Sequence, residues 1–333
     1  MMSEAVLWKK EGSRNESLVN VKKNYDDWLN DWLDFRKARV KESTYIRYRN
    51  MVNNHIRPYL GGYSISEIDT FRMESYVSGL LTNGRLDQEG GLSPKSILDI
   101  LTVVKETFRY AGFYGVNTVC CFDHVSVRQK PKEMRVLSRR EEKDLVALLL
   151  SDMDSYKVGV FLSLYTGIRI GELCALQWKD ISLTDKTMKI CKTMQRLQKP
   201  EPDETAKTHI IITEPKSQMA KRMIPLPDFV VGVMAAFESL PDYYILTGSG
   251  KHFAEPRTMH NRFKTYINQS GIEDANFHSL RHTFATRCVE SGFDIKSLSE
   301  ILGHSSVKIT LDKYVHSSLE QKRFNMDKLK ACY

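Results

Sequence analysis

Apolar side chains recur at a helical period through the first third of the chain. Trp28, Leu29 and Trp32 follow the spacing of about 3.6 residues that places side chains on one face of a helix, and Gly61 and Gly62 then interrupt the pattern. Further helices are expected over residues 69–81 and 93–111. The second of these begins with a serine N-cap and a proline at its first helical position. This region therefore reads as an all-α unit.

Alternation of apolar and polar positions appears in the second half of the chain. It predicts short strands over residues 188–193, 208–214 and 222–226, which would form a small antiparallel sheet. Helical patterns surround these strands, over residues 139–150, 156–166, 229–240, 256–269, 278–291, 295–302, 307–314 and 318–330. The fold class is mainly α with a small antiparallel sheet, in which an all-α domain precedes an α+β domain.

The length of 333 residues suits two domains. The pattern changes predict a short N-terminal extension (1–24), a helical domain (25–125), a basic linker (126–138) and a second domain (139–333). The second domain is expected to end in a charged tail helix (318–330) that docks on a neighbouring protomer or folds back on its own domain.

Composition describes a folded, moderately basic chain. Lysine and arginine number 49 against 41 acidic residues, which gives a formal charge of +8 and a pI near 9.0. No segment approaches the roughly 18–20 apolar residues of a membrane span, and charges interrupt the first residues where a signal peptide would be apolar. We therefore expect a cytoplasmic protein without membrane contact. The six cysteines form no C-x-x-C pair and are expected to be reduced.

Two stretches concentrate positive charge. The first also carries two hydroxyl side chains near the start of a predicted helix, which favours phosphate binding. It comprises Arg36, Lys37, Arg39, Lys41, Ser43, Thr44, Arg47 and Arg49. The second lies in the linker and includes Arg128, Lys130, Lys132 and Arg135. Either stretch alone is typical of a solvated helix surface, whereas two of them joined by a hinge suit a clamp around a DNA duplex.

Five separate segments carry side chains suited to one reaction. They are residues 166–172, 215–217, 278–283, 302–305 and 312–314. Together they supply the arginines, lysine, histidines and tyrosine of a phosphate site with a nucleophile. His278 and Arg281 are three residues apart and share one helix face. The i, i+4 spacing of His278 and His282 also occurs in zinc sites, but Arg281 between them would repel a cation, so no metal is expected.

From about Tyr25 to Leu329 the sequence resembles the tyrosine recombinase (phage-integrase) family, with the two-domain layout of Xer-like members. The family pattern contains T-G-x-R-x-x-E, a lysine in a β-hairpin, H-x-x-R, G-H and a nucleophilic tyrosine. These positions fall on Arg169, Lys216, His278, Arg281, His304 and Tyr314. Arg222 resembles the family's segment after the lysine and is expected to contact DNA. Relatives that bind distant arm sites carry a further domain at the front, so this form is either a two-domain recombinase or lacks that domain.

The resemblance implies a site-specific recombinase or integrase of a mobile element that forms a 3′-phosphotyrosyl intermediate. Tyr314 is the implied nucleophile. Arg169 and Arg281 would stabilise the non-bridging phosphate oxygens, because paired donors bind the extra charge of the transition state. Lys216 is the expected general acid for the leaving 5′-oxygen.

Two histidines and a glutamate complete this scheme. His278 is the candidate general base, and His304 is expected to donate to a phosphate oxygen and to position Tyr314. Glu172 would orient Arg169 from one helical turn away. The division between the two histidines stays open.

The implied partners are double-stranded DNA with specific recombination sites and three further copies of the chain, as a homotetramer in the synaptic complex. An accessory factor that sets direction is a further partner, and no cofactor is expected. Two alternatives stay open: a type IB topoisomerase, and a non-catalytic DNA-binding regulator with the same fold. The sequence does not distinguish integration from excision, inversion or dimer resolution.

Overall fold

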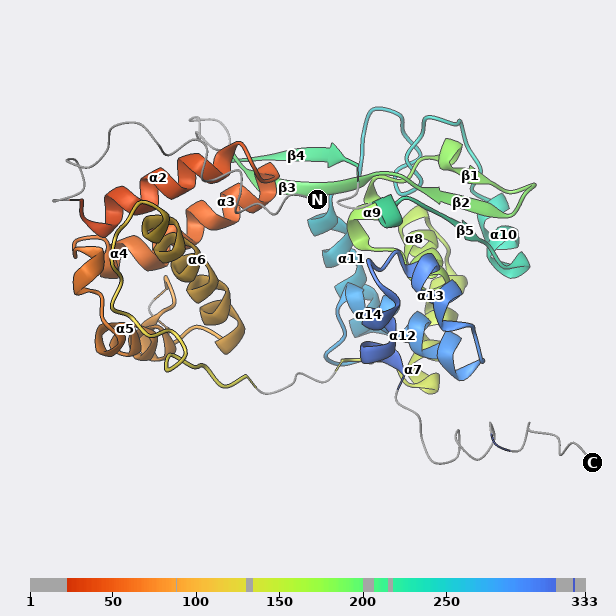
Figure 1. The fold of residues 1–333 in the computed structure, drawn as a ribbon. Coiled ribbons are helices and arrows are strands. Elements are labelled where there is room, and N and C mark those ends of the chain that lie inside the picture. Colours follow the sequence, from red (N-terminus) through yellow and green to blue (C-terminus); the bar gives the residue numbers. More distant parts are fainter. Residues whose placement is uncertain are drawn as a thin grey trace, which may run out of the picture. The chain divides into compact units, whose positions relative to one another are not determined.

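The computed structural model describes residues 23–87, 89–129, 134–199, 207–214, 218–315 and 326 (Figure 1). The chain separates into two compact units, Met1–Pro131 and Lys132–Tyr333. Each unit has its own cluster of buried apolar side chains. No helix among the described residues is long and apolar enough to cross a bilayer.

The N-terminal unit is a bundle of helices, as the apolar period predicts. Its elements are α2 (Tyr25–Lys37), α3 (Glu42–Met51), the π-helical turn η1 (Val52–Ile56), α4 (Arg57–Leu60), the 3-10 turn η2 (Ile65–Glu67), α5 (Thr70–Asn83) and α6 (Pro94–Phe113). Ser93 caps α6 and Pro94 opens it, as expected. Trp28 and Trp32 on α2 are buried, so the apolar stripe of this helix forms part of the core.

Helices α3 and α4 run on through the π-helical turn η1 without a break. The turn ends at Ile56, and the N–H of Arg57 bonds to the carbonyl of Val52, five residues back. Pro58 follows directly. A proline has no backbone N–H to donate, and in a regular α-helix its ring clashes with the carbonyl four residues back. The widened turn therefore accommodates Pro58 without ending the helix.

The C-terminal unit is mainly helical with strands in its middle part. Its helices are α7 (Arg139–Ser151), α8 (Ser155–Thr166), α9 (Ile170–Cys174), α10 (Asp228–Ala235), α11 (Pro256–Gln269), α12 (Phe277–Glu290), α13 (Ile295–Leu302) and α14 (Val307–Tyr314). Most agree closely with the predicted ranges. Helix α10 ends at Ala235, before the predicted end at residue 240, although apolar positions continue beyond it. The predicted tail helix over 318–330 lies outside the described residues, apart from Met326.

The strands form two antiparallel sheets where the sequence predicts one. Strands β1 (Ile181–Ser182), β2 (Thr187–Ile190) and β5 (Arg222–Pro225) form a three-stranded sheet in the order β1-β2-β5. Strands β3 (Thr193–Gln198) and β4 (Thr208–Thr213) pair separately, as Figure 1 shows. The expectation of a single sheet is wrong because β3, which is mostly polar, takes β4 as its own partner.

Candidate active site

The first part of the site is the turn between α8 and α9. Gly167 ends α8 in the left-handed region (φ 64°), and a Cβ there would lie 2.6 Å from Cδ1 of Phe284. Arg169 is the N-cap of α9. Its backbone N–H donates to Oε2 of Glu172 at 2.9 Å, and its Nη1 donates to Oε1 at 2.8 Å. Glu172 thus orients the arginine that the sequence assigns to phosphate.

Glu172 is shared with a second arginine. Arg222 on β5 donates from Nη1 to Oε1 at 3.1 Å and from Nη2 to Oε2 at 2.8 Å. Burial alone would raise the pKa of Glu172, but the bonds and charge of Arg222 and the charge of Arg169 outweigh burial and lower this pKa to about 2. Glu172 is therefore ionised at any physiological pH.

Arg222, which the sequence predicts to contact DNA, makes its contacts within the protein in this structure. Its side chain is 5% exposed, and besides Glu172 it donates to the carbonyls of Ile301 and Ala220. These internal bonds occupy most of the guanidinium donors. Glu172 connects Arg222 to Arg169, and a contact of Arg222 with DNA stays a prediction.

The last carbonyls of α13 collect three guanidinium groups. The bonds run from Arg222 to Ile301, from Arg281 to Leu302 and from Arg169 to Gly303, with N···O distances of 2.6, 2.6 and 3.4 Å. Arg281 also donates to the carbonyl of Gly167 at 2.8 Å. A helix C-terminus carries partial negative charge, so it reduces the repulsion among these cations. Burial and the charge of Arg169 lower the pKa of Arg281 to about 9, which leaves it protonated at neutral pH.

Tyr314 lies at the end of α14 with 6% of its surface exposed. Its Oη is 2.9 Å from Nδ1 of His282, a residue whose spacing from His278 suggests only a zinc ligand. The ring of His304 lies parallel to the phenol, with centroids 6.2 Å apart and 3° between the planes. Nδ1 of His304 is 2.8 Å from Oγ1 of Thr310. The sequence does not indicate this contact either. The position of His282 one turn after His278 is the signal that was available.

His278 is exposed on the same helix. Its ring meets His282 edge-on, with centroids 4.5 Å apart. Among the described residues no hydrogen bond joins His278 to Tyr314. The structure therefore brings Arg169, Arg281, His304 and Tyr314 together, with His278 at the edge of the group.

All three histidines of this cluster have lowered pKa values. Desolvation by the surrounding protein atoms is the main cause in each case, including that of His278, whose ring is only partly covered. The pKa of His278 falls to about 4, with further contributions from His282 and Arg281, and that of His304 falls to about 3, with contributions from Arg281 and Arg169. Burial, Lys313 and Arg281 lower the pKa of His282. The imidazoles are thus neutral near pH 7 and able to accept protons.

Burial raises the pKa of Tyr314, against the lowering effect of the charges of Arg281 and Arg169. The phenol therefore keeps its proton at neutral pH and needs an acceptor before it can attack phosphorus.

Lys216 lies outside the described residues. Within the described ranges, no group of three or more histidine, cysteine or acidic side chains is placed to hold a metal ion.

The first basic stretch is partly engaged within the N-terminal unit. Arg36 pairs with Glu106 at 2.7 Å, and Arg47 pairs with Asp99 at 2.5 Å. Arg47 keeps an exposed side chain in the middle of α3. At the end of α2 and the start of α3, Lys37, Arg39 and Lys41 are exposed, and Ser43 and Thr44 are half-buried.

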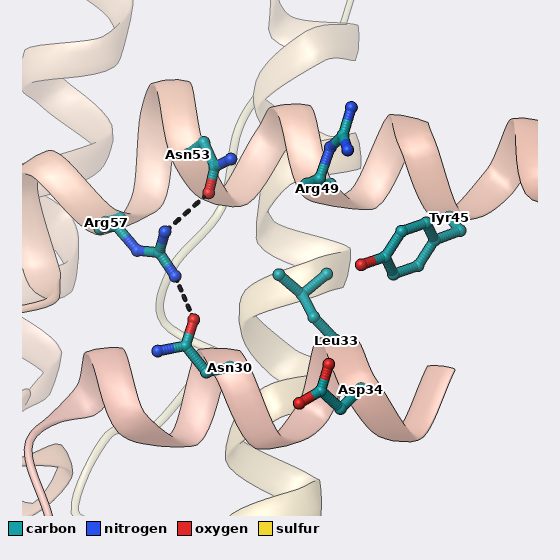
Figure 2. Close-up of a pocket in the computed structure, with 7 residues that line it drawn as sticks. All are labelled: Asn30, Leu33, Asp34, Tyr45, Arg49, Asn53 and Arg57. Atoms are coloured by element: carbon teal, nitrogen blue, oxygen red, sulfur yellow. Dashed lines mark hydrogen bonds between the residues drawn. The ribbon is translucent and has the colours of Figure 1, made fainter. Parts of the chain in front are cut away.

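Arg49 lines a polar pocket of about 300 Å³ between α2 and α3–η1 (Figure 2). Arg57 spans this pocket, donating to Oδ1 of Asn53 at 2.9 Å and to Oδ1 of Asn30. These two hydrogen bonds join opposite walls of the pocket and hold α2 against η1 and α4.

Of the two described basic residues from the predicted linker, one is exposed and the other bonds within the protein. Arg128 is exposed, whereas Arg135 bonds to both oxygens of Glu141 and to the carbonyls of Val136 and Glu273. A contact of Arg135 with DNA stays a prediction. Lys130 and Lys132 lie outside the described residues.

Two protein-family models match the chain. The model of the phage integrase family matches residues 135–321, more than half of the chain, and the model of the phage integrase N-terminal SAM-like domain matches residues 24–81. The chain belongs to the phage integrase family. It is a tyrosine-type site-specific recombinase, as the resemblance implies, and the topoisomerase and regulator alternatives are not favoured.

Curated relatives and solved structures agree with this family. The chain is similar to a XerC-like tyrosine recombinase of Caldanaerobacter subterraneus subsp. tengcongensis, with 26% identity over 89% of this chain and 80% of the relative. It is 24% identical to the ICEBs1 integrase of Bacillus subtilis over 87% of this chain and 78% of that protein.

Among solved structures, the Tn1549 transposon integrase in complex with circular intermediate DNA has a TM-score of 0.72 at 18% identity, over 92% of this chain and 99% of that chain. A lambda integrase tetramer bound to a Holliday junction has a TM-score of 0.63 at 18% identity, over 95% and 87%. At this identity the likeness establishes the fold alone, which is mainly helical with small antiparallel sheets.

Proposed function

We propose that the chain recombines double-stranded DNA at specific sites of a mobile element, through a 3′-phosphotyrosyl link to Tyr314. The observation that carries the proposal is the phenol of Tyr314, which lies between His282 and His304 and within the field of Arg281 and Arg169. A nucleophile beside two phosphate-binding cations has the geometry of a phosphoryl-transfer site.

The arginines have fixed directions before DNA arrives. Arg169 is aimed by Glu172, and Arg281 by the carbonyls of Gly167 and Leu302. A phosphate would take up their remaining donors through its non-bridging oxygens. Such preoriented donors are each worth about 3–4 kcal/mol in the transition state. His304, fixed by Thr310, is the proposed additional donor to a phosphate oxygen.

Cleavage conserves the energy of the phosphodiester. The Tyr314 oxygen bonds to phosphorus, the 5′-oxygen leaves with a proton from Lys216, and the phosphotyrosine stores the bond until another 5′-hydroxyl attacks. We place the core-binding part at 25–125, the linker at 126–138 and the catalytic part at 139–333. In this scheme, the exposed side chains Lys37, Arg39, Lys41, Arg47 and Arg128 contact phosphates.

Exchange between two duplexes requires four cleavage events, so we propose a homotetramer on paired sites. The lambda integrase tetramer bound to a Holliday junction supports this assembly by analogy of fold. The tail helix over 318–330 would dock on a neighbouring protomer. An accessory factor that sets direction and a cytoplasmic location complete the proposal.

Trapping of the covalent intermediate tests the function. A nicked suicide duplex should accumulate a protein–DNA adduct with the unmodified chain. Tyr314→Phe should bind the same duplex without forming the adduct, because only the nucleophilic oxygen is removed. Tyr114→Phe, a change at a partly exposed tyrosine of the N-terminal unit, is the control and should still form the adduct. Adduct formation by Tyr314→Phe would overturn the assignment.

A further inference from the structure

The hydroxyl of Tyr314 is in direct contact with His282. The Oη to Nδ1 distance is 2.9 Å, and the ring centroids are 5.8 Å apart. Because the phenol is only 6% exposed, bulk water has little access to its proton. The two side chains come from α14 and α12, so the contact also fixes the last turn of α14 on the helix that carries Arg281.

We propose that His282 is a catalytic residue that positions Tyr314 and accepts its proton through Nδ1 as the tyrosine attacks phosphorus. The inference rests on the proposed function and names the proton acceptor of that site. It requires the tautomer with hydrogen on Nε2, in which Nδ1 is the acceptor.

The surroundings of His282 suit a base. The titratable and charged groups that face it are His278 and Arg281 on α12 and Lys313 and Tyr314 on α14. Burial and the two cations lower the pKa of His282, and within the described part of the chain no carboxylate bonds to it. The resting imidazole is therefore neutral and ready to take a proton at neutral pH.

The proton count of the reaction closes with this assignment. As the bond from Oη to phosphorus forms, the phenol proton passes to Nδ1 of His282. As the bond from phosphorus to the 5′-oxygen breaks, Lys216 supplies the proton of the new 5′-hydroxyl. Rejoining reverses both transfers: the attacking 5′-hydroxyl returns its proton to Lys216, and the His282 imidazolium protonates the departing tyrosine.

His278 is the competing acceptor, and the geometry disfavours it. Its ring packs edge-on against His282, whereas His282 itself bonds to Oη. His278 is exposed, which leaves it available to the phosphate or to solvent. The two histidines therefore provide a matched pair of variants on one helix.

The test is the pH dependence of single-turnover cleavage for His282→Asn and His278→Asn. The asparagine amide oxygen can occupy the place of Nδ1 and accept the phenol hydrogen bond, but it cannot take the proton. His282→Asn should bind DNA normally and cleave through Tyr314 roughly 10²–10⁴-fold more slowly. Its rate should rise with pH, because hydroxide must replace the lost base. His278→Asn should keep the pH dependence of the unmodified chain.

Each result has one reading. An unchanged rate and pH profile in His282→Asn would overturn the proposal, and so would a hydroxide-dependent rate confined to His278→Asn. If thermal unfolding shows that His282→Asn does not fold, His282→Gln keeps most of the imidazole volume and should show the same hydroxide dependence. An adduct that persists in Tyr314→Phe would instead reject the proposed function itself.

Discussion

Both carboxylate oxygens of Glu172 accept hydrogen bonds from the guanidinium of Arg222, at 3.1 and 2.8 Å. The side chains are 4% and 5% exposed, so the pair is shielded from water. The same carboxylate orients Arg169, and Arg222 also bonds to the end of α13. Arg222 on β5 is thus connected through the Glu172 carboxylate to Arg169, the arginine proposed to bind phosphate.

Arg222→Lys should impair cleavage without weakening DNA binding. Lysine keeps the charge but cannot make the two-point contact, so Glu172 would orient Arg169 less firmly. Loss of one charge-assisted hydrogen bond, about 1.5–3 kcal/mol, corresponds to roughly 10–100-fold in single-turnover cleavage. Arg196→Lys is the matched control, because Arg196 also makes a two-point pair, with Glu255, but is 41% exposed. Equal effects in both variants would contradict this reading.

The same carboxylate should make stability depend on acid pH. The pKa of Glu172 is about 2 in the folded chain, against about 4.5 for an unperturbed glutamate. The pair therefore stabilises the fold fully above about pH 5, and this contribution is lost as pH falls toward about 2. Thermal unfolding between these limits should show a flatter pH dependence for Glu172→Gln, and no such flattening for Glu238→Gln at an exposed position. Parallel curves for Glu172→Gln and the unmodified chain would contradict the expectation.

Much of this fold follows from local signals. Ser93 and Pro94 define the start of α6, and Gly167 defines the end of α8, because each residue suits a backbone position that few others tolerate. Apolar periodicity locates α11, α13 and α14 at their observed bounds. The spacing of His278 and Arg281 correctly places them on one helix.

The remaining features depend on contacts between distant segments. No local pattern reveals that Arg222 turns inward, because its partners Glu172 and Ile301 lie 50 and 79 residues away. The bond from His282 to Tyr314 likewise joins residues 32 apart. The π-helical turn before Pro58 is missed for another reason: a proline usually signals a helix break, and here a widened turn absorbs it.

The exposed lysines at the end of α2 and the start of α3 should contribute to DNA affinity through phosphate contacts. Lys37 and Lys41 are exposed there. Replacing both by alanine should reduce the salt dependence of binding by about one unit of logarithmic slope for each lost contact. Arg85→Ala is the control, because Arg85 is exposed in the loop after α5 and pairs with the neighbouring Asp87. A slope that stays the same in the lysine variant would make these residues ordinary solvated surface.

A comparison of Gly303 with Gly271 separates the effect of backbone strain on stability from an effect on cleavage. Gly303 follows α13 with φ 63°, and a Cβ would lie 3.1 Å from Cδ and Nη1 of Arg222. Gly271 has nearly the same conformation, φ 66°, but nothing lies within 4 Å of its Cβ position. Both glycine-to-alanine variants should lose roughly 1–2 kcal/mol of stability, because each places a side chain in the left-handed region.

Gly303→Ala alone should also lose cleavage, by at least about 10-fold, the effect of one displaced charge-assisted contact. The added methyl group would push Arg222 away from Glu172, and it would shift a carbonyl that accepts from Arg169 next to His304. Melting temperature and single-turnover cleavage, measured for both variants, separate the two effects. If Gly271→Ala loses as much cleavage as Gly303→Ala, general destabilisation explains both, and the contact of Arg222 with the end of α13 is not what aligns the site.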